Sequence, residues 1–282
     1  MLVEIFEFAF MRKAFLVGIL LAVIIPCIGV IVVFKRLSMI GDALSHTSLA
    51  GVAAGLIGNI NPVVGAMIAC TGAAFGIEAI RKKIPRYAEM SIAIMMSAGV
   101  GLAGILSGFV PNAAGFNSFL FGSIVAISDF ELKLVVTVSI IVAGCFLLFY
   151  KELCYIAFDE NSARLSGVPV DLVNFIFTLL TAVTVSVAAR TVGALMVSSL
   201  MVVPVACSLQ VAKSYRQTVC WSITFAVLST GVGLFVAYYR GLKPGGTIVL
   251  TGVLLLFLLF FIKAVVKKFR RNASKMVGTQ AT

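Results

Sequence analysis

The sequence describes a strongly apolar and basic chain. Of its 282 residues, 61% are hydrophobic and only 12% are charged, and its mean hydropathy is +1.14. Soluble domains carry about a quarter of their residues as charged side chains, so this composition excludes a soluble globular protein. The apolar stretches reach the roughly 20 residues that a helix needs to cross a bilayer, and they lack the alternation of a membrane barrel. We therefore expect an all-α polytopic membrane bundle.

Nine apolar runs follow one another along the chain. They cover residues 13–34, 40–58, 62–80, 88–110, 132–150, 171–189, 192–210, 217–239 and 246–264. The second and seventh runs contain several polar residues and could be short, broken or buried in the bundle. We expect eight or nine spans in a single domain over residues 1–282. No small-residue cleavage site follows the first run, which argues against a cleaved signal peptide.

Basic residues gather between particular apolar runs. The groups are Lys35 with Arg36, residues 81–86, Lys151, residues 213–216 and the tail 267–271. With nine spans, all of these groups fall on one side of the membrane, and the positive-inside rule makes that side the cytoplasm. This predicts a cytoplasmic C-terminus. The same rule explains the net charge of +11, with anionic lipid headgroups as the partners of the basic residues. The sequence has no basic segment interleaved with aromatic residues, so it gives no indication of nucleic-acid binding.

Two familiar motifs are either misleading or missing. GVGLAG, residues 99–104, satisfies GxGxxG, but it lies inside an apolar run without the strand and βαβ unit of a dinucleotide site. With similar glycine pairs elsewhere, it instead predicts close packing of helices within the bundle. No GxxxxGK[ST] occurs, so any ATP coupling must come from another subunit. The six cysteines include no CxxC pair and indicate neither disulfides nor a thiolate metal site.

The candidate site lies in IGDALSHTSLAGVAAG, residues 40–55. Asp42 and the only histidine of the chain, His46, are four residues apart, so in a helix both project from one face, with Ser45 beside them. A carboxylate and an imidazole together suit Zn²⁺, Mn²⁺ or Fe²⁺. Ionisable side chains within a membrane segment are costly and tend to mark a substrate pathway. The pair therefore predicts a site for a passing metal ion.

Two alternatives and one gap accompany this interpretation. His46 could make a structural hydrogen bond, and Asp42 could be the N-cap of its helix. Zinc usually takes four ligands, so the others would come from other helices, water or a partner. Asn59, Asn61, Asn117 and Glu78 are further polar residues near apolar runs, but no motif assigns them as ligands.

Five sequence blocks resemble one family, the ABC-3 permease subunits of zinc, manganese and iron ABC importers. They are GDALSHTSLAGVAAG (41–55), FLFGSIVAIS (119–128), FDENSARLSGVPVD (158–171), VGALMVSSLMVVPVA (192–206) and YYRGLKPGGTIVL (238–250), in the order and spacing of the family. The resemblance implies a type II ABC importer-like fold, a homodimer in the bacterial cytoplasmic membrane, and metal handling by Asp42 and His46. It also implies a cytoplasmic ATPase subunit that binds ATP, and a periplasmic binding protein or extracytoplasmic metal-binding lipoprotein that delivers the metal. The permease itself would be no enzyme and hold no permanent cofactor.

The segment 151–171 lies on the side assigned to the cytoplasm. DENSARLSGVP predicts a short helix capped by Asp159, with Glu160 at its positive end, Arg164 late in the helix and Gly167 at its end. The resemblance implies that this is the coupling helix, which docks on the ATPase and converts nucleotide-driven closure into movement of the permease. An ordinary loop is the alternative. Arg190 lies near the outer face, where we expect contact with lipid headgroups rather than with the binding protein.

Two other functions compete with an ATP-driven importer. An intramembrane hydrolase would need a nucleophile and a base, but Asp42, Ser45 and His46 on one helical turn project side by side and are poorly placed for a relay. The chain has neither GxSxG nor HExxH. A gradient-driven carrier would need several buried carboxylates to bind a coupling ion, and the apolar runs contain very few.

The identity of the metal is a separate question. The first apolar run and the blocks around His46 and residues 119–128 resemble the zinc branch of the family more than the manganese branch, in which a proline more often follows the histidine. We therefore expect Zn²⁺. Manganese and iron stay open, because the ligand types alone do not exclude them.

Overall fold

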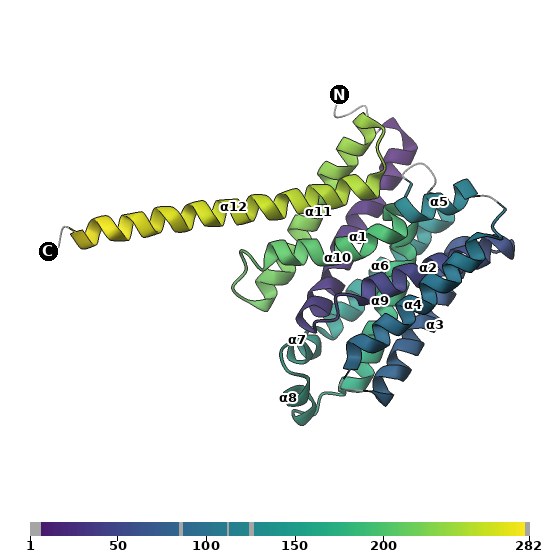
Figure 1. Ribbon diagram of the computed structural model, residues 1–282, viewed down its shortest axis with the longest axis horizontal. Helices are drawn as coiled ribbons and strands as arrows, with labels where there is room; N and C mark the ends of the chain where they lie inside the picture. Colours follow the sequence, from purple (N-terminus) through teal and green to yellow (C-terminus); the bar gives the residue numbers. More distant parts are fainter. Residues whose placement is uncertain (1–6, 85–86, 112, 124–126, 280–282) are drawn as a thin grey trace.

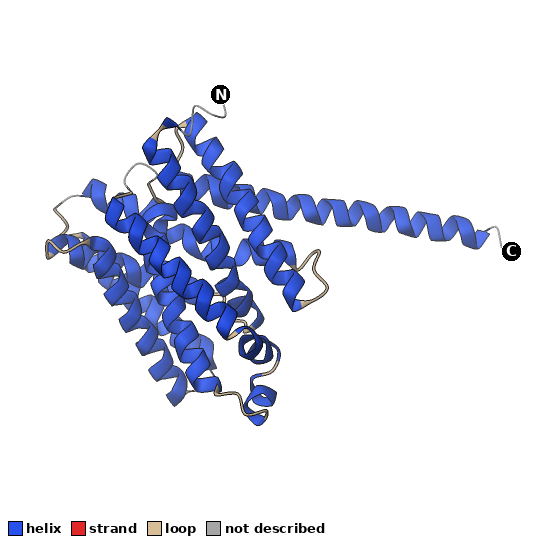
Figure 2. Ribbon diagram, turned by 180° about the vertical axis from the view of Figure 1, so that it is seen from behind, coloured by secondary structure: helices blue, strands red, loops and turns tan. Residues whose placement is uncertain are grey.

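In the computed structural model, residues 7–84, 87–111, 113–123 and 127–279 are described. Helices account for most of these residues, and none of the described residues forms a strand (Figure 2). The predicted all-α class is therefore confirmed. A membrane explains this outcome, because a helix satisfies its own backbone hydrogen bonds where no water is present to do so.

The helices follow the predicted apolar runs closely. In chain order they are α1 (Ala9–Phe34), α2 (Ile40–Ile57), α3 (Pro62–Lys83), α4 (Ala88–Ser107), α5 (Ala113–Phe121), α6 (Asp129–Leu148), α7 (Tyr150–Phe158), α8 (Glu160–Leu165), α9 (Val170–Ala188), the π-helical turn η3 (Ala189–Gly193), α10 (Ala194–Ser208), α11 (Tyr215–Arg240) and α12 (Pro244–Thr279). Within the described residues, eight helices are long and apolar enough to span a membrane, with η3 continuing the span of α9. The seventh predicted run is the exception, because α10 has only 15 residues.

The helix ends form two opposite faces of the bundle (Figure 1). We call one the α8 end, where Lys35, Arg81, Glu160 and Asp171 line a common polar cavity of about 340 Å³. We call the other the α5 end, which holds the first residues of α1 together with α5, η3 and the start of α12.

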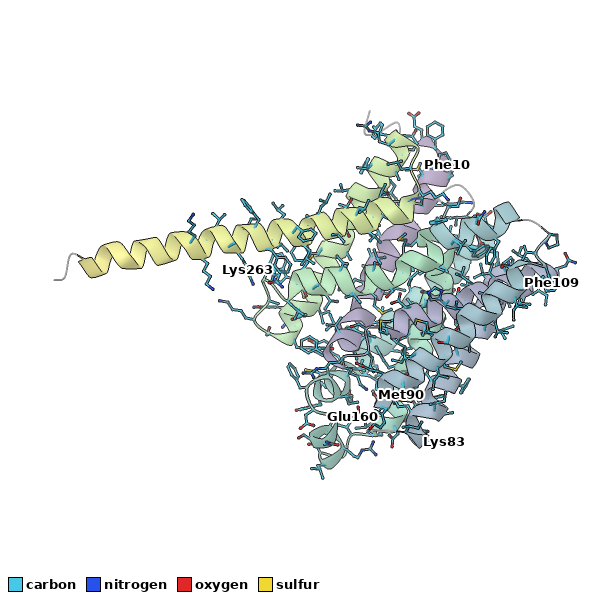
Figure 3. The ribbon with its side chains drawn as sticks, viewed as in Figure 1. Phe10, Lys83, Met90, Phe109, Glu160 and Lys263 are labelled. Carbon is cyan, nitrogen blue, oxygen red and sulfur yellow. The ribbon has the colours of Figure 1, made fainter. Side chains whose placement is uncertain are left out.

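Helix α12 begins at the α5 end and extends well beyond the bundle (Figures 1 and 3). Its Lys263 donates a hydrogen bond to the side-chain oxygen of Gln210 over 3.2 Å. Gln210 lies in the connection between α10 and α11, on the far side of the bundle from Pro244. The basic part of α12 therefore lies beyond the level at which α11 begins.

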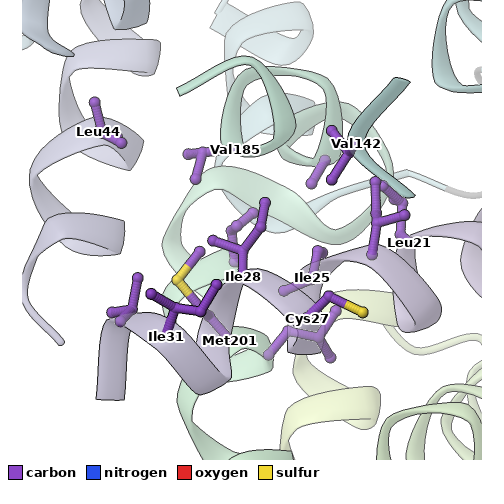
Figure 4. Close-up of a cluster of buried hydrophobic side chains, with 14 of the residues drawn as sticks. Leu21, Ile25, Cys27, Ile28, Ile31, Leu44, Val142, Val185 and Met201 are labelled. Carbon is purple, nitrogen blue, oxygen red and sulfur yellow. The ribbon is translucent and has the colours of Figure 1, made fainter. Parts of the chain in front are cut away.

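Helix α2 lies at the centre of the bundle, packed against α3 and α4 and, on other sides, α9 and α10. The neighbouring core is formed by α1, whose Leu21, Ile25 and Ile28 are almost fully buried and lie near Met201 of α10 and Val185 of α9 (Figure 4). Because lipid is as apolar as these side chains, close packing rather than transfer from water favours this arrangement.

Glycines bring some helices into close contact, as the sequence predicts, but not all of them act in this way. A Cβ on Gly51 of α2 would overlap the carbonyl oxygen of Gly65 of α3, so these two helices cross backbone to backbone. Gly99 of α4 packs on Thr47 of α2. By contrast, Gly101 and Gly104 have open space around them, so the expectation that the whole GVGLAG motif holds this bundle together is wrong.

Three glycines meet at the α5 end. Gly122, after α5, and Gly193, at the end of η3, have φ values of +77° and +98°, a region that residues with a side chain rarely adopt. A Cβ on Gly193 would lie 2.5 Å from the carbonyl carbon of Phe121, and a Cβ on Gly245 would overlap the carbonyl oxygen of Val192. Each glycine belongs to a different one of the sequence blocks described above, so three of these blocks contact one another at the α5 end.

Candidate metal pair and docking helix

Asp42 and His46 lie in the first two turns of α2 and are both half-buried, whereas Ala43, Leu44 and Ser45 between them are buried. Over residues 40–53 of α2, the pair is the part that stays accessible. Their spacing of four residues places the carboxylate and the imidazole on one face. The N-cap of α2 is Met39, with no side-chain hydrogen bond. The alternative in which Asp42 caps the helix is therefore wrong.

The pair has open coordination positions. Among the described residues, neither Asp42 nor His46 takes part in a side-chain hydrogen bond or an ion pair, and no three His, Cys, Asp or Glu side chains are grouped so that they could hold a metal. The alternative in which His46 makes a structural hydrogen bond therefore has no support among the described residues. The Ser45 hydroxyl is also buried without a hydrogen-bond partner there, so it makes no relay with Asp42 or His46.

The other polar residues singled out from the sequence have local structural tasks or lie elsewhere. Glu78 is buried and pairs with Arg81 one turn later, with 2.8 Å between Nη2 and Oε2. Asn61 is the N-cap of α3 and accepts a hydrogen bond from the backbone of Val63. Asn117 lines a cavity of about 650 Å³ at the α5 end. Glu78 forms no group of three His, Cys, Asp or Glu side chains with Asp42 and His46 within the described residues.

The predicted short helix is present as α8, and its boundaries arise from local contacts. The Asp159 carboxylate accepts hydrogen bonds from the backbone of Asn161 and Ser162 and from the Ser162 hydroxyl. These bonds, that of the hydroxyl first, lower the pKa of Asp159 below its ordinary value. At the other end, Gly167 has a φ of +83°, and Val168 donates its N–H to the carbonyl oxygen of Ala163. Asp159 as cap and Gly167 as end are confirmed.

Helix α8 is joined to α9 by a paired contact across the intervening turn. Arg164 donates two hydrogen bonds to Asp171, over 3.0 and 2.8 Å. These bonds raise the pKa of Arg164. Both side chains are mostly exposed, and the free Leu165 side chain is 90% exposed. Helix α8 thus presents an accessible surface at this end of the molecule, where Glu160 is labelled in Figure 3.

A polar contact that the sequence did not reveal joins α8 to the end of α1. Lys35 donates a hydrogen bond over 2.6 Å to the side-chain oxygen of Asn174, and its Nζ lies 3.3 Å from Glu160. Asn174 in turn donates to the other oxygen of Glu160 over 3.2 Å. Burial lowers the pKa of Lys35, and the charge of Glu160 opposes this shift. No local pattern relates residues so far apart in the chain.

Arg190 contradicts the expectation of contact with lipid headgroups. Its side chain is only 17% exposed, its Nε lies 3.2 Å from Glu131, and it donates a hydrogen bond to the Ser118 hydroxyl. The guanidinium also lies over the ring of Phe119, 4.6 Å from the centroid. Arg190 therefore belongs to the interior of the α5 end, because partners from α5 and α6 compensate its charge.

Comparison with known proteins agrees with this architecture. The model of the ABC 3 transport family matches residues 7–264. A probable metal transport system membrane protein of Treponema pallidum is 34% identical over 92% of this chain and 97% of its own. The manganese transport system membrane protein MntC of Listeria monocytogenes is 29% identical over 90% and 91% of the two chains, and the high-affinity zinc uptake system membrane protein ZnuB of Haemophilus influenzae is 27% identical over 90% and 98%.

The fold is also similar to that of solved structures. A chain of PsaBC from Streptococcus pneumoniae, solved in complex with a Fab, superposes with a TM-score of 0.82, at 27% identity, over 93% of this chain and 96% of that one. The similarity thus covers nearly the whole of both chains, from α1 into α12.

Proposed function

The chain belongs to the ABC 3 transport family as a metal transport permease, and we propose that it carries Zn²⁺ into the cytoplasm along a path that includes Asp42 and His46. The observation that carries this proposal is the half-buried pair itself. A carboxylate and an imidazole share an accessible face of a mostly buried membrane helix, with no partner among the described residues. Uncompensated ionisable groups are costly there, and a transported cation compensates them.

A second copy of the chain completes the coordination in this proposal. Two ligands are too few for Zn²⁺, which usually takes four, and no third His, Cys, Asp or Glu of the described residues is grouped with them. Two copies that face each other across Asp42 and His46 would supply two carboxylates and two imidazoles. Weak or partial coordination also suits transport, because the ion must leave again.

The charge distribution supports an orientation with the α8 end in the cytoplasm. Lys35, Arg81 and Lys82 lie there, and the cations before α11 and at the end of α12 extend the same side. By the positive-inside rule this side is cytoplasmic, which places the C-terminus inside and the start of α1 outside. The proposed site for the ATPase subunit is then the exposed surface of α8, including Asp159, Glu160, Arg164 and Gly167.

The α5 end is then the face that receives metal from a binding protein. It contains the cavity of about 650 Å³, lined by polar and aromatic residues such as Asn117, Tyr238 and Lys243. Manganese is the second candidate cargo, because MntC, which is named for manganese, is about as similar to this chain as ZnuB. Ligand types do not separate these metals, so selection rests on geometry and supply.

The test is transport by the permease reconstituted with its ATPase and binding protein. We expect the ATPase chain to co-purify with the permease, and Zn²⁺ to be taken up in preference to Mn²⁺ and Fe²⁺. Asp42→Asn and His46→Gln should each abolish uptake while the complex still assembles. Glu89→Gln, which removes an exposed carboxylate of α4, is the matched control and should transport normally. Full uptake by both pair variants would exclude the pair from the path, and preference for Mn²⁺ would make manganese the cargo.

A further inference from the structure

The proposed function leaves open how a movement of α8 reaches the metal pair. We propose that Lys35 transmits it: its ion pair with Glu160 connects the docking helix to the turn that begins α2, and thereby to Asp42. This role rests on the proposed function, since it presumes that α8 docks on the ATPase.

Helix α8 has few attachments to the membrane helices other than α9, to which the contact between Arg164 and Asp171 also joins it. Its backbone packs mainly against its neighbour α7 and, more sparsely, against α9. Toward α1, the side chain of Lys35 provides the link, with Nζ held between Glu160 and Asn174 at 3.3 and 2.6 Å. The side chain of Glu160 is 42% exposed, whereas that of Lys35 is 8% exposed. The ion pair therefore runs from an accessible helix into the interior.

A second contact lies directly beside this ion pair. The rings of Phe34 and Phe158 meet edge to face, with 5.5 Å between their centroids. Two consecutive residues at the end of α1 thus contact the last residue of α7 and the first residue of α8. A displacement of the α7–α8 unit cannot occur without displacing the end of α1 or breaking both contacts.

The connection from Lys35 to α2 is stiff. Leu37 donates its N–H to the carbonyl oxygen of Val32, and Arg36 adopts a φ of +58°, which together form the tight turn that ends α1. The Ile40 N–H then bonds to the Leu37 carbonyl oxygen, so α2 begins without a flexible linker. Asp42 follows in the first turn of α2. A displacement of Lys35 therefore moves the start of α2, and with it Asp42, as a rigid body.

The chemistry of the contact favours transmission over stability alone. Removing a lysine from water is costly, and an apolar side chain of similar size would pack at this position at lower cost. An ion pair with two hydrogen bonds gives the contact a defined direction that apolar packing lacks. Arg81 and Glu78 lie in the same polar cavity but are paired with each other, so they do not replace Glu160 as the partner of Lys35.

The test separates coupling from folding by measuring Zn²⁺ transported per ATP hydrolysed in the reconstituted complex. With Lys35→Met, we expect assembly and basal ATP hydrolysis to stay within about twofold of the wild type, and the transport ratio to fall about tenfold, as for a typical coupling between sites. Lys35→Arg keeps the ion pair, so its ratio of Zn²⁺ transported per ATP should equal that of the wild type. Asn174→Leu, which removes the hydrogen-bond partner that Lys35 and Glu160 share, should also lower the ratio, and the double variant with Lys35→Met should be no worse than Lys35→Met alone.

The control is Lys13→Met, which breaks an ion pair with Asp129 at the α5 end and should leave the ratio unchanged. An unchanged ratio in both Lys35→Met and Asn174→Leu would overturn the proposal, as would parallel losses of hydrolysis and transport. If Lys35→Met fails to assemble, Asn174→Leu decides, because it disrupts the same contact without removing either charge. A wild-type complex that hydrolyses ATP without moving Zn²⁺, Mn²⁺ or Fe²⁺ would instead refute the proposed function itself.

Discussion

Arg190 of η3 and Glu131 of α6 form an ion pair inside the α5 end, with 3.2 Å between Nε and Oε1. The other oxygen of Glu131 accepts a hydrogen bond from the backbone N–H of Ser128, the N-cap of α6. Arg190 also donates to Ser118 of α5. One arginine thus joins η3 to α5 and α6, which come much earlier in the chain, next to the glycines that pack there.

Breaking this ion pair on one side should destabilise the protein strongly. Arg190→Leu leaves the Glu131 carboxylate buried without its cation, so we expect the free energy of unfolding to fall by about 3 kcal/mol. Adding Glu131→Gln removes the unpaired charge but keeps an oxygen for the Ser128 N–H, and should recover much of this loss. Unfolding of the purified permease in increasing SDS measures both variants.

The exposed ion pair between Lys13 and Asp129 is the control for this prediction, since Asp129 lies in the same first turn of α6. Lys13→Met should change the unfolding midpoint far less than Arg190→Leu, because water already solvates the carboxylate. If the double variant of Arg190 and Glu131 is as unstable as Arg190→Leu alone, the loss comes from packing of the arginine rather than from its charge.

The helices could be predicted from the sequence because the thickness of a bilayer sets their length and composition. The boundaries of α8 could also be predicted, since Asp159 and Gly167 act on backbone groups within a few residues of themselves. The spacing of Asp42 and His46 places them on one face for the same reason. Each of these features depends on local geometry alone.

Contacts between distant segments could not be read in this way. Arg190 lies between two apolar runs, which is also the position of a residue at the membrane surface, and its partner Glu131 belongs to another helix. The rotation of α4 decides that Gly99 meets Thr47 while Gly101 faces open space. The sequence motif contains both glycines and carries no signal for that rotation.

The cap of α8 should matter for coupling more than for the fold. Asp159→Ala removes the acceptor for two backbone N–H groups, so we expect α8 to fray and Zn²⁺ transport to fall about fivefold, whereas Asp159→Asn should keep most activity because asparagine also caps helices. The pKa of Asp159 is lowered in the folded protein, so its stabilising effect is present above the ordinary aspartate pKa and is lost only as the pH falls through the lowered value. Transport of the wild type at pH 6 to 8 should therefore show no step from this residue, and equal losses in both variants would contradict the capping role.

Gly245 and Gly246 offer a matched pair of substitutions in the first turn of α12. A Cβ on Gly245 would overlap the carbonyl oxygen of Val192 and lie 3.1 Å from that of Phe121, whereas a Cβ on Gly246 would meet no atom within 4 Å. Alanine favours a helix over glycine equally at both positions, so their difference reports the contact alone. We expect Gly246→Ala to be neutral or stabilising by up to about 1 kcal/mol.

Gly245→Ala should instead destabilise by about 3 kcal/mol, because both overlapping groups are backbone and cannot rotate away. The SDS unfolding midpoint measures the two variants side by side, and transport by the reconstituted complex shows whether the contact also matters in the working cycle. Lost transport with an intact complex in Gly245→Ala would mean that α5, η3 and α12 must approach this closely at some stage of transport. Equal midpoints for the two variants would mean that the α5 end yields easily and that the shared place of the three glycines has no role in holding it closed.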